Sequence, residues 1–419
     1  MVSRRLEPPQ SRHRSAACRS PCTGSRKEVV IESERYQRPE HYASGVVQRV
    51  AYSPEGFLSQ RIGGVSRCFC EIARALADDE ELGWHPTLHA AVHGNRHLRD
   101  LSGDARAGRS RVEVFGRFLP LPGELRRLAH PWSSRRFVGA LRPPPAVVHD
   151  TGHRLASSWS STTPLVVTIH DLINDEDPAY RSSRSESLRL KALAIERATR
   201  IVVPSFATRD ALIRVHDVEA DRIDVVHHGS RMPAPDDRDP IGLPYLLHVG
   251  GRGRYKDFTT LLQAFARIRR RGFDGILASV GGGGLRGSER SSMEALGLPP
   301  GSIRTFDADD RRLATLYAHA RALVVPSRIE GFGMPIVEAM SLGCPVACMD
   351  APGCAEVAGD AALLAPVGDD AALAENLERI VGEDGERSRL VVAGRDRAAE
   401  FTWAASARKH AACYEHALG

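Results

Sequence analysis

Short apolar runs alternate with segments of helical periodicity along most of the chain. This alternation is typical of parallel strands that are each followed by a covering helix. In the first part of the chain the strands predicted in this way are 46–52, 164–171, 200–205 and 222–230. The predicted helices there are residues 185–198 and a segment in which Phe69, Ile72, Ala73 and Leu76 recur at positions i, i+3, i+4 and i+7.

A stretch rich in proline and aspartate, residues 231–244, predicts a linker, and the same alternation then begins again. The strands predicted after it are 245–251, 275–284, 303–307, 321–327 and 345–350. The helices predicted after it are 257–270, 309–320, one that starts at Pro335 and ends before Gly343, and 401–418. The pattern therefore predicts an α/β protein of two Rossmann-like domains whose strand ends face a shared ligand cleft.

The positive charge of the chain is concentrated near its N-terminus. The net charge is +5, and residues 1–48 carry nine basic and five acidic side chains, so the remainder is nearly neutral. A neutral body argues against a nucleic-acid partner. Residues 1–45 are rich in Arg, Ser and Pro and lack the apolar segment of a signal peptide, so we expect either a disordered basic tail or a mis-assigned start codon. We place the domains at 46–235 and 236–400, followed by a terminal helix at 401–419.

The cysteines predict a reduced protein. There are eight, and none forms a C-x-x-C pair. A cytoplasmic chain fits this usage best, with Cys68, Cys70, Cys344 and Cys348 as small packing residues. No apolar run approaches the length of about eighteen residues that would predict a membrane span.

Two carboxylates stand out in the segment RIEGFGMPIVEAM, residues 328–340. Glu330 lies in a glycine loop that follows a predicted strand, and Glu338 lies near the start of the next helix. The free N–H groups of a helix start favour anions, so the segment suits a ligand with both phosphate and hydroxyl groups. The alternative is that Glu330 is a solvated loop charge and Glu338 caps helix N–H groups.

Cations and a histidine follow other predicted strands. Arg252 and Lys256 lie in the loop VGGRGRYKDF, where positive charge at a helix start favours a bound phosphate over a merely solvated basic loop. His170 and Asp171 end the strand TIHD. For His170, a buried and hydrogen-bonded structural role is the alternative to a catalytic one.

Two further patterns have competing interpretations. Gly282, Gly284 and Gly287 match the G-x-G-x-x-G of a dinucleotide site, but they follow the second strand of their domain rather than the first, which disfavours that interpretation. Asp307 and Asp309 could hold a divalent metal, but Asp309 also suits the cap of the following helix, which we prefer.

One segment of the first domain combines arginines with apolar side chains. Residues 123–142 contain five arginines, one acid, and apolar and aromatic residues that include Trp132 and Phe137. This composition is typical of a helix that lies in an anionic membrane surface, although Pro131 divides it. The alternative is a helix pair that buries its apolar stripe in the protein.

Taken together, residues 46–418 resemble the retaining glycosyltransferases of family 4, which have the GT-B architecture. The features that carry the resemblance are Gly63 and Gly64 in GGVSRCF, the TIHD, VPS (203–205) and HHGS (227–230) segments, the basic loop through Lys256, the two glutamates separated by seven residues, and the FTW helix. More narrowly, the chain is similar to bacterial mannosyltransferase-like enzymes of surface-polysaccharide assembly. The architecture implies a terminal helix that crosses back to the first domain.

The resemblance implies an enzyme that needs neither a metal ion nor a cofactor. The implied reaction transfers a hexose to a saccharide or lipid-linked acceptor. The first candidate for the donor is GDP-mannose, which would supply mannose. It implies that Glu338 binds the ribose and that Arg252 and Lys256 bind the diphosphate. It also implies that Glu330 and His170 contact the sugar and that Asp171, the neighbour of His170, belongs to the same catalytic group. Gly63 and Gly64 would approach the donor from the first domain. The backbone N–H groups of Gly331, Phe332, Gly333 and Met334 would lie along it.

One departure affects Arg252, because Gly251 fills the place where the family more usually has arginine. The alternatives to transfer are a nucleotide-sugar epimerase of the same architecture, a dinucleotide-dependent oxidoreductase and a non-catalytic nucleotide-sugar sensor. The four residues Glu330, Glu338, His170 and Lys256 are all present, which disfavours the sensor.

Overall fold

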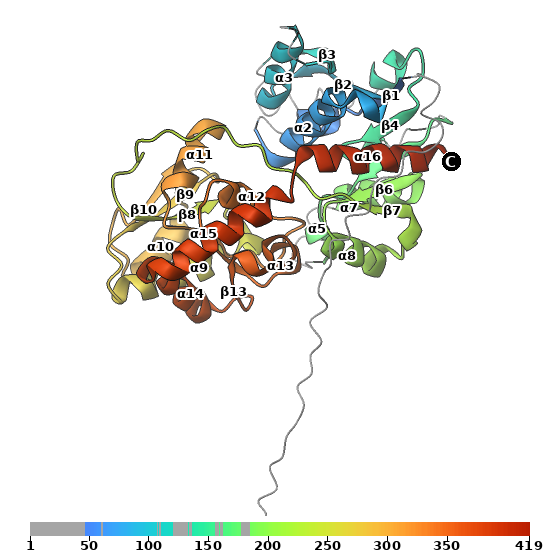
Figure 1. Cartoon of the computed structure of the whole chain (residues 1–419). Coiled ribbons are helices and arrows are strands. Elements are labelled where there is room, and N and C mark those ends of the chain that lie inside the picture. The colour runs from blue at the N-terminus through green and yellow to red at the C-terminus, as the bar shows by residue number, and fades with distance from the viewer. Residues whose placement is uncertain are drawn as a thin grey trace, which may run out of the picture. The chain divides into compact units, whose positions relative to one another are not determined.

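Two parallel sheets form the framework of the protein (Figure 1). The computed structural model describes residues 47–419 apart from 60–61, 107, 109, 120–132, 134–135, 156–158, 160–161 and 177–184. The first sheet has the strand order β3-β2-β1-β4-β5-β6-β7 and the second has the order β10-β9-β8-β11-β12-β13. All strand pairs recorded in both sheets are parallel. The predicted α/β class with two Rossmann-like sheets is confirmed.

The first sheet and its connections make up the N-terminal half, residues 47–230. Its strands are β1 (Gln48–Tyr52), β2 (Trp84–His93), β3 (Glu113–Phe118), β4 (Val147–Asp150), β5 (Leu165–Thr168), β6 (Arg200–Val203) and β7 (Ile223–Val225). Its helices are α1 (Glu55–Leu58), α2 (Gly64–Asp78), α3 (Arg96–Arg106), α5 (Ile173–Glu176), α7 (Ser185–Arg197) and α8 (Phe206–His216), with short 3-10 turns η2 (Glu80–Leu82) and η4 (Ala220–Arg222).

The second sheet and its connections make up the C-terminal half, residues 245–400. Its strands are β8 (Tyr245–Val249), β9 (Ile276–Val280), β10 (Ile303–Phe306), β11 (Ala322–Val325), β12 (Val346–Met349) and β13 (Leu363–Ala365). Its helices are α9 (Phe258–Arg270), α10 (Gly287–Ala295), α11 (Asp310–His319), α12 (Met334–Ser341), α13 (Pro352–Ala358), α14 (Asp370–Gly382) and α15 (Asp384–Ala399), with 3-10 turns η5 (Arg254–Lys256) and η6 (Gly359–Ala361). The last helix of the chain is α16 (Trp403–Leu418).

Each sheet is covered by apolar side chains on both faces. Val50 and Tyr52 of β1 pack into one cluster while Ala51 packs into another, as the alternation of side chains along a strand requires. In the second sheet Leu247 and Leu246 likewise enter different clusters. Burial on both faces explains why the strands read as continuous apolar runs rather than as alternating ones.

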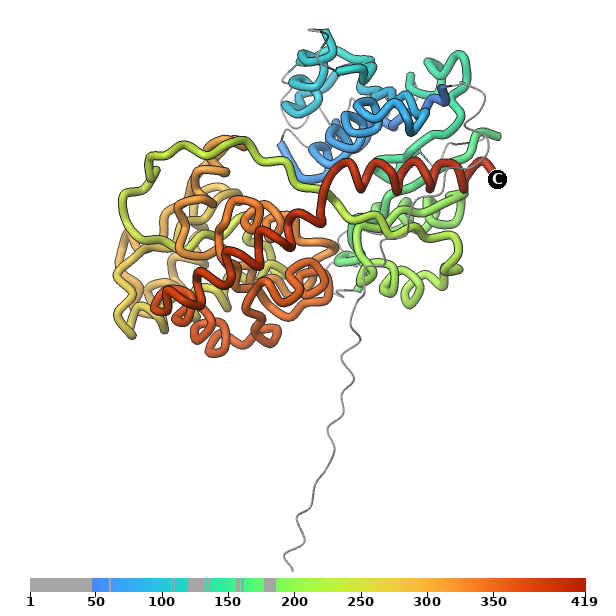
Figure 2. Tube along the Cα trace, viewed as in Figure 1, coloured from blue at the N-terminus to red at the C-terminus, as the bar shows by residue number. Residues whose placement is uncertain are grey.

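Helix α16 packs on the N-terminal half, along α2 (Figure 2). Trp403, Ala407, Ala411 and Tyr414 lie in the same apolar cluster as Val50 of β1. The Tyr414 hydroxyl lies 2.8 Å from the Tyr52 hydroxyl and 2.9 Å from Nδ1 of His149. The chain therefore returns from the second sheet to the first at its C-terminus.

Several predictions from the sequence can be compared with the observed elements. The segment 222–230 is a strand only at Ile223–Val225, and 275–284 only at Ile276–Val280, because glycine and polar residues follow in both. The segment 231–244 has neither helix nor strand, as predicted for a linker. The cysteines Cys68, Cys70, Cys344 and Cys348 are buried and free, so their predicted packing role is confirmed. Within the described ranges, no helix combines the length and apolarity that a membrane span needs.

Two predicted segments fall largely or wholly outside the described residues. The tail 1–45 lies outside them entirely, and of 123–142 only Ser133 and residues 136–142 are described. Phe137 and Leu141 of that segment are buried in the core beside β4 and β5. A membrane contact by 123–142 would therefore depend on its other apolar residues.

Candidate functional site

The loop between β11 and α12 carries the first predicted carboxylate, Glu330. Gly333 caps α12 with a φ of 95°, a left-handed conformation that glycine adopts without strain. Pro335 follows within the first turn, as predicted. The loop thus ends with the N-terminus of α12 at the carboxyl edge of the second sheet, with Glu338 one turn further along the helix.

Lys256, which lies in the turn η5 after β8, forms an ion pair with Glu330 of this loop. The Lys256 ammonium lies 2.5 Å from Oε1 of Glu330, and both side chains are largely shielded from solvent. Burial is the largest single influence and lowers the pKa of Lys256, but the Glu330 carboxylate and Tyr255 together outweigh it, so the net shift is upward. The amine is therefore a fixed positive charge beside the glycine loop at neutral pH.

Gly331 fits the glycine loop against the N-terminal half. A Cβ atom on Gly331 would lie 1.9 Å from the carbonyl oxygen of His170 and 3.1 Å from Cβ of Asp171, so no larger residue fits. The Gly331 carbonyl accepts hydrogen bonds from the hydroxyls of Ser205 at 2.6 Å and Thr208 at 3.1 Å. The structure thus brings the TIHD and VPS segments to the loop that carries Glu330.

His170 lies beside the rings of Phe69 and His228, at centroid distances of 5.5 and 5.7 Å. Burial lowers its pKa to about 3, with a smaller contribution from His153, so the ring is neutral at physiological pH. Its Nε2 atom is buried and has no hydrogen-bond partner among the described residues. A buried polar atom without a protein partner suits a residue whose partner comes from a ligand.

Asp171 and Glu330 line a common cavity of about 490 Å³. Thr208 and Arg214 of α8 also line it. The Asp171 side chain accepts a hydrogen bond from the backbone N–H of Ile173 at 3.2 Å, which fixes its orientation.

Glycines 63 and 64 begin α2 at the opposite edge of the site. A Cβ atom on Gly64 would lie 3.7 Å from the sulfur of Met334, so the start of α2 and the start of α12 approach closely. Phe332 is buried, and its ring packs on His228 with centroids 5.1 Å apart. Phe332 can therefore offer a ligand its backbone N–H but not its ring.

Arg252 has a different environment from that of Lys256. Its Nε donates to Oε1 of Glu289 at 3.0 Å. Its remaining nitrogens donate to the carbonyl oxygens of Gly281, Gly282, Gly283 and Gly284 at 2.7 to 3.3 Å. The guanidinium therefore shapes the glycine loop after β9, and diphosphate binding by Arg252 stays a prediction.

Glu338 is buried, with 4% of its surface exposed. Its Oε2 accepts from the Tyr317 hydroxyl at 2.9 Å, and its Oε1 is paired with the guanidinium of Arg67 on α2. Burial raises the pKa of Glu338, and Arg67 and the Tyr317 hydroxyl act against the rise. Arg67 and Tyr317 thus complete the surroundings of the predicted ribose carboxylate.

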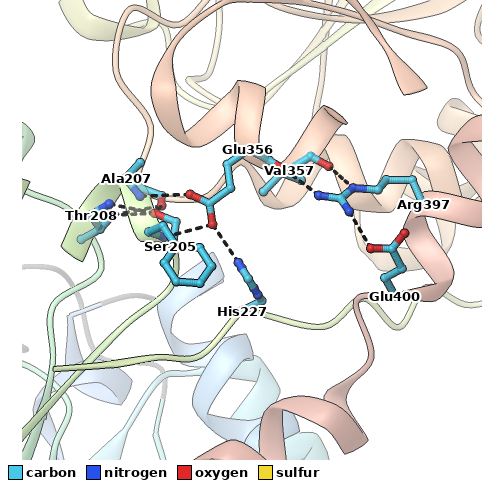
Figure 3. A network of polar contacts seen from close by, with 10 residues as sticks. Ser205, Ala207, Thr208, His227, Glu356, Val357, Arg397 and Glu400 are labelled. Carbon is cyan, nitrogen blue, oxygen red and sulfur yellow. Dashed lines mark hydrogen bonds and ion pairs between the residues drawn. The ribbon is translucent and has the colours of Figure 1, made fainter. Parts of the chain in front are cut away.

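A second polar network joins the two halves at the start of α8 (Figure 3). The Glu356 carboxylate accepts from the backbone N–H groups of Phe206 and Ala207, each at 3.0 Å, and lies 2.8 Å from Nε2 of His227. Arg397 donates to the Glu356 carbonyl at 2.7 Å. An acidic side chain on free N–H groups stabilises a helix start, so Glu356 ties α13 to α8.

One carboxylate of the Asp307 and Asp309 pair caps α11. The Asp309 side chain accepts from the N–H of Arg312 at 2.9 Å and caps α11, so the predicted capping role is confirmed. In the part of the chain that the structure describes, no three His, Cys, Asp or Glu side chains gather in a way that could hold a metal ion.

Comparison with known proteins assigns the chain to a family. The family models described as "Glycosyltransferase Family 4" and "Glycosyl transferases group 1" match residues 62–231 and 237–397. D-inositol 3-phosphate glycosyltransferase of Frankia alni is 31% identical over 63% of this chain and 70% of its own length. The chain belongs to glycosyltransferase family 4. O-antigen chain mannosyltransferase B of Escherichia coli is 29% identical over 81% of this glycosyltransferase and 92% of its own length.

Solved structures with the same fold confirm the GT-B architecture of this glycosyltransferase. Sucrose-phosphate synthase from Thermosynechococcus elongatus superposes with a TM-score of 0.67 at 21% identity, over 88% of this chain and 98% of the other. Anabaena HepE in complex with UDP and glucose superposes with a TM-score of 0.65 at 20% identity, over 87% and 98%.

Sequence reasoning did not single out three polar groups that contact the predicted residues or segments, namely Arg67, Tyr317 and Glu356. Arg67 could have been found by the argument that singled out Lys256, because it is a cation in the first turn or so of a helix, where positive charge is unfavourable without an anion. No local signal marks Tyr317 or Glu356, whose partners lie far away in the sequence.

Proposed function

We propose that this family 4 glycosyltransferase transfers a hexose from a nucleoside-diphosphate sugar to a hydroxyl of a saccharide or lipid-linked acceptor, with retention at the anomeric carbon. Mannose from GDP-mannose is the donor we propose first. The observation that carries the proposal is the fit of Gly331 against His170, which sets the Lys256–Glu330 pair of one half beside the histidine and aspartate of the other. The extensive similarity to a mannosyltransferase supports the choice of sugar.

Each group has a role in this proposal. Glu338 accepts the ribose hydroxyls, Lys256 faces the diphosphate, and the N–H groups of residues 331–334 lie along the donor at the N-terminus of α12. Glu330 and His170 contact the sugar. Gly64 leaves room for the donor on the side of the N-terminal half, since only a sulfur atom lies near its missing Cβ.

The reaction itself needs charge stabilisation more than a nucleophile. The bond between the anomeric carbon and the diphosphate oxygen breaks, and the acceptor oxygen forms its bond on the same face. The acceptor proton passes to the departing phosphate oxygen. The Lys256 ammonium and the α12 N-terminus stabilise the negative charge that grows on the diphosphate, and each such group contributes about 2–4 kcal/mol.

A thermal-shift screen with GDP-mannose, UDP-glucose and UDP-N-acetylglucosamine, followed by radiolabelled sugar transfer to a lipid acceptor fraction, tests the proposed function. A ligand at one hundred times its Kd stabilises the folded state by about 2.7 kcal/mol, which raises the Tm of a protein of this size by several degrees. We expect GDP-mannose to give the largest shift and to support transfer. Absence of a shift with every nucleotide sugar would refute the proposal.

We propose that the enzyme needs no metal ion, because Lys256 and the start of α12 supply positive charge where a metal would otherwise stand. Activity should therefore survive EDTA within about twofold. The measurement is the initial transfer rate before and after chelation. Loss of activity that magnesium restores would contradict this and would reopen the question of a metal at Asp307 and Asp309.

We also propose peripheral binding to anionic membranes through residues 123–142. Replacement of Arg126, Arg127, Arg135, Arg136 and Arg142 by glutamine should abolish co-sedimentation with anionic vesicles and leave the Kd for the donor unchanged. The control is the same measurement with neutral vesicles. Equal co-sedimentation of both forms with both kinds of vesicle would rule out this role.

A further inference from the structure

Arg67 crosses from the N-terminal half to the C-terminal half. It lies on α2, one turn after Gly63, and only 11% of its side chain is exposed. Its guanidinium pairs with Glu338 of α12 and lies 3.5 Å from Oδ1 of Asp310 at the start of α11. A buried arginine that spans two halves and ends on a predicted ligand-binding carboxylate calls for a functional explanation.

The Glu338 carboxylate is fixed by two partners but has hydrogen-bond acceptor positions left over. Arg67 occupies Oε1 and the Tyr317 hydroxyl occupies Oε2. An ionised carboxylate can accept about four hydrogen bonds, so one position on each oxygen remains. Two neighbouring acceptor positions of fixed orientation match the two hydroxyls of a ribose.

We propose that Arg67 is a positioning residue for the donor nucleotide, which keeps the Glu338 carboxylate ionised and oriented so that it accepts the ribose 2′ and 3′ hydroxyls. This inference rests on the proposed function, in which Glu338 binds ribose. Because Arg67 belongs to α2 and Glu338 to α12, the ion pair also makes ribose binding depend on the contact between the two halves.

The charges around Glu338 support this role. Burial raises the pKa of Glu338, Asp310 raises it further, and Arg67 is the cation that opposes both. Glu71 and His97 are the other titratable groups near Arg67, and burial lowers the pKa of His97, so this histidine does not supply a second cation. Without Arg67, the carboxyl would take up a proton at a higher pH and would then be a poorer acceptor for hydroxyls.

The test compares ribonucleotides with 2′,3′-dideoxynucleotides by calorimetric titration of UDP, GDP and ADP and their dideoxy forms. The Arg67→Met variant should bind the tightest ribonucleotide at least tenfold more weakly than wild type at pH 7.5, and at least thirtyfold more weakly at pH 6. Its affinity for the matching dideoxy form should stay within twofold of wild type. Arg67→Lys keeps the positive charge, so its ribonucleotide affinity should change little between pH 7.5 and pH 6.

Arg74→Met is the matched control. Arg74 lies on the same helix and pairs with Asp104 at 2.9 Å, away from α12, so its replacement should leave both affinities unchanged. A second measurement is a double-mutant cycle. In the Glu338→Gln background, Arg67→Met should lower the ribonucleotide affinity by less than twofold, because the side chain on which Arg67 acts is already neutral. If Arg67→Met does not fold, as judged by its circular dichroism melt, the Arg67→Lys variant and the comparison of Glu338→Gln with the Glu338→Gln/Arg67→Met double variant carry the test.

An equal loss of ribonucleotide and dideoxynucleotide affinity in Arg67→Met would overturn the inference, because Arg67 would then act on the phosphates or on the fold. Wild-type affinity in Arg67→Met would overturn it as well. If wild type binds none of the ribonucleotides, the proposed function fails and the inference falls with it. That outcome is distinguishable, because it is seen in wild type before any variant is measured.

Discussion

Replacement of Lys256 by alanine is expected to lower kcat/KM about 100-fold, equivalent to about 2.7 kcal/mol of transition-state stabilisation. The change removes the fixed positive charge that lies 2.5 Å from Glu330 and that the proposal sets against the leaving diphosphate. It also leaves the shielded Glu330 carboxylate without its cation, which repels the donor phosphates. Steady-state kinetics with the donor varied at saturating acceptor give the value.

The matched control for this variant is Lys409→Ala. Lys409 is an exposed lysine on α16, so its removal should change kcat/KM by less than twofold. A Lys256→Ala enzyme with the rate of wild type would show that this cation does not serve the reaction. A Lys256→Arg variant should recover part of the activity, since it keeps the charge but not the geometry.

The Gly331→Ala variant is expected to lose at least 100-fold in kcat/KM. The added Cβ would lie 1.9 Å from the carbonyl oxygen of His170, and backbone on both sides must move to relieve the overlap. Overpacking of this kind costs about 1–3 kcal/mol of stability, so the Tm should fall as well. The shift would part Glu330 from His170 and break the hydrogen bonds that Ser205 and Thr208 donate to the Gly331 carbonyl.

Gly385→Ala is the control for this loop variant. Gly385 is exposed on α15, and no atom within 4 Å would meet its added Cβ, so stability and activity should stay close to those of wild type. If Gly331→Ala kept the activity and Tm of wild type, the close fit between the glycine loop and the TIHD segment would be irrelevant to function.

The fold was predictable where strands are buried on both faces and helices have one apolar stripe. The strands β8 to β12 and the helix α2 were found for this reason, whereas β13, which has only three residues, was not predicted. The strand β2 was missed because Pro86 and three histidines interrupt its apolar run, and β3 was missed because it lies at an edge with most of its side chains exposed. The strand β4 is only four residues long and follows three prolines, which hide it from a periodicity argument.

The candidate site was predictable to the extent that parallel strands bring their carboxyl ends to one edge. Lys256, Glu330 and His170 all follow strands, and the structure brings them to one loop. The partners of these groups were not predictable, because they depend on contacts between distant segments. Arg252 illustrates this, since its pairing with Glu289 depends on how the glycine loop after β9 folds back on it.

The proposed retaining transfer is tested most directly by proton NMR of the reaction with GDP-mannose and a mannose-terminated lipid-linked saccharide. We predict a new α-anomeric mannosyl signal that grows as GDP-mannose is consumed, at a rate about 100-fold lower with Lys256→Ala. A β-anomeric product, or consumption of GDP-mannose without any new glycosidic signal, would contradict the proposed function.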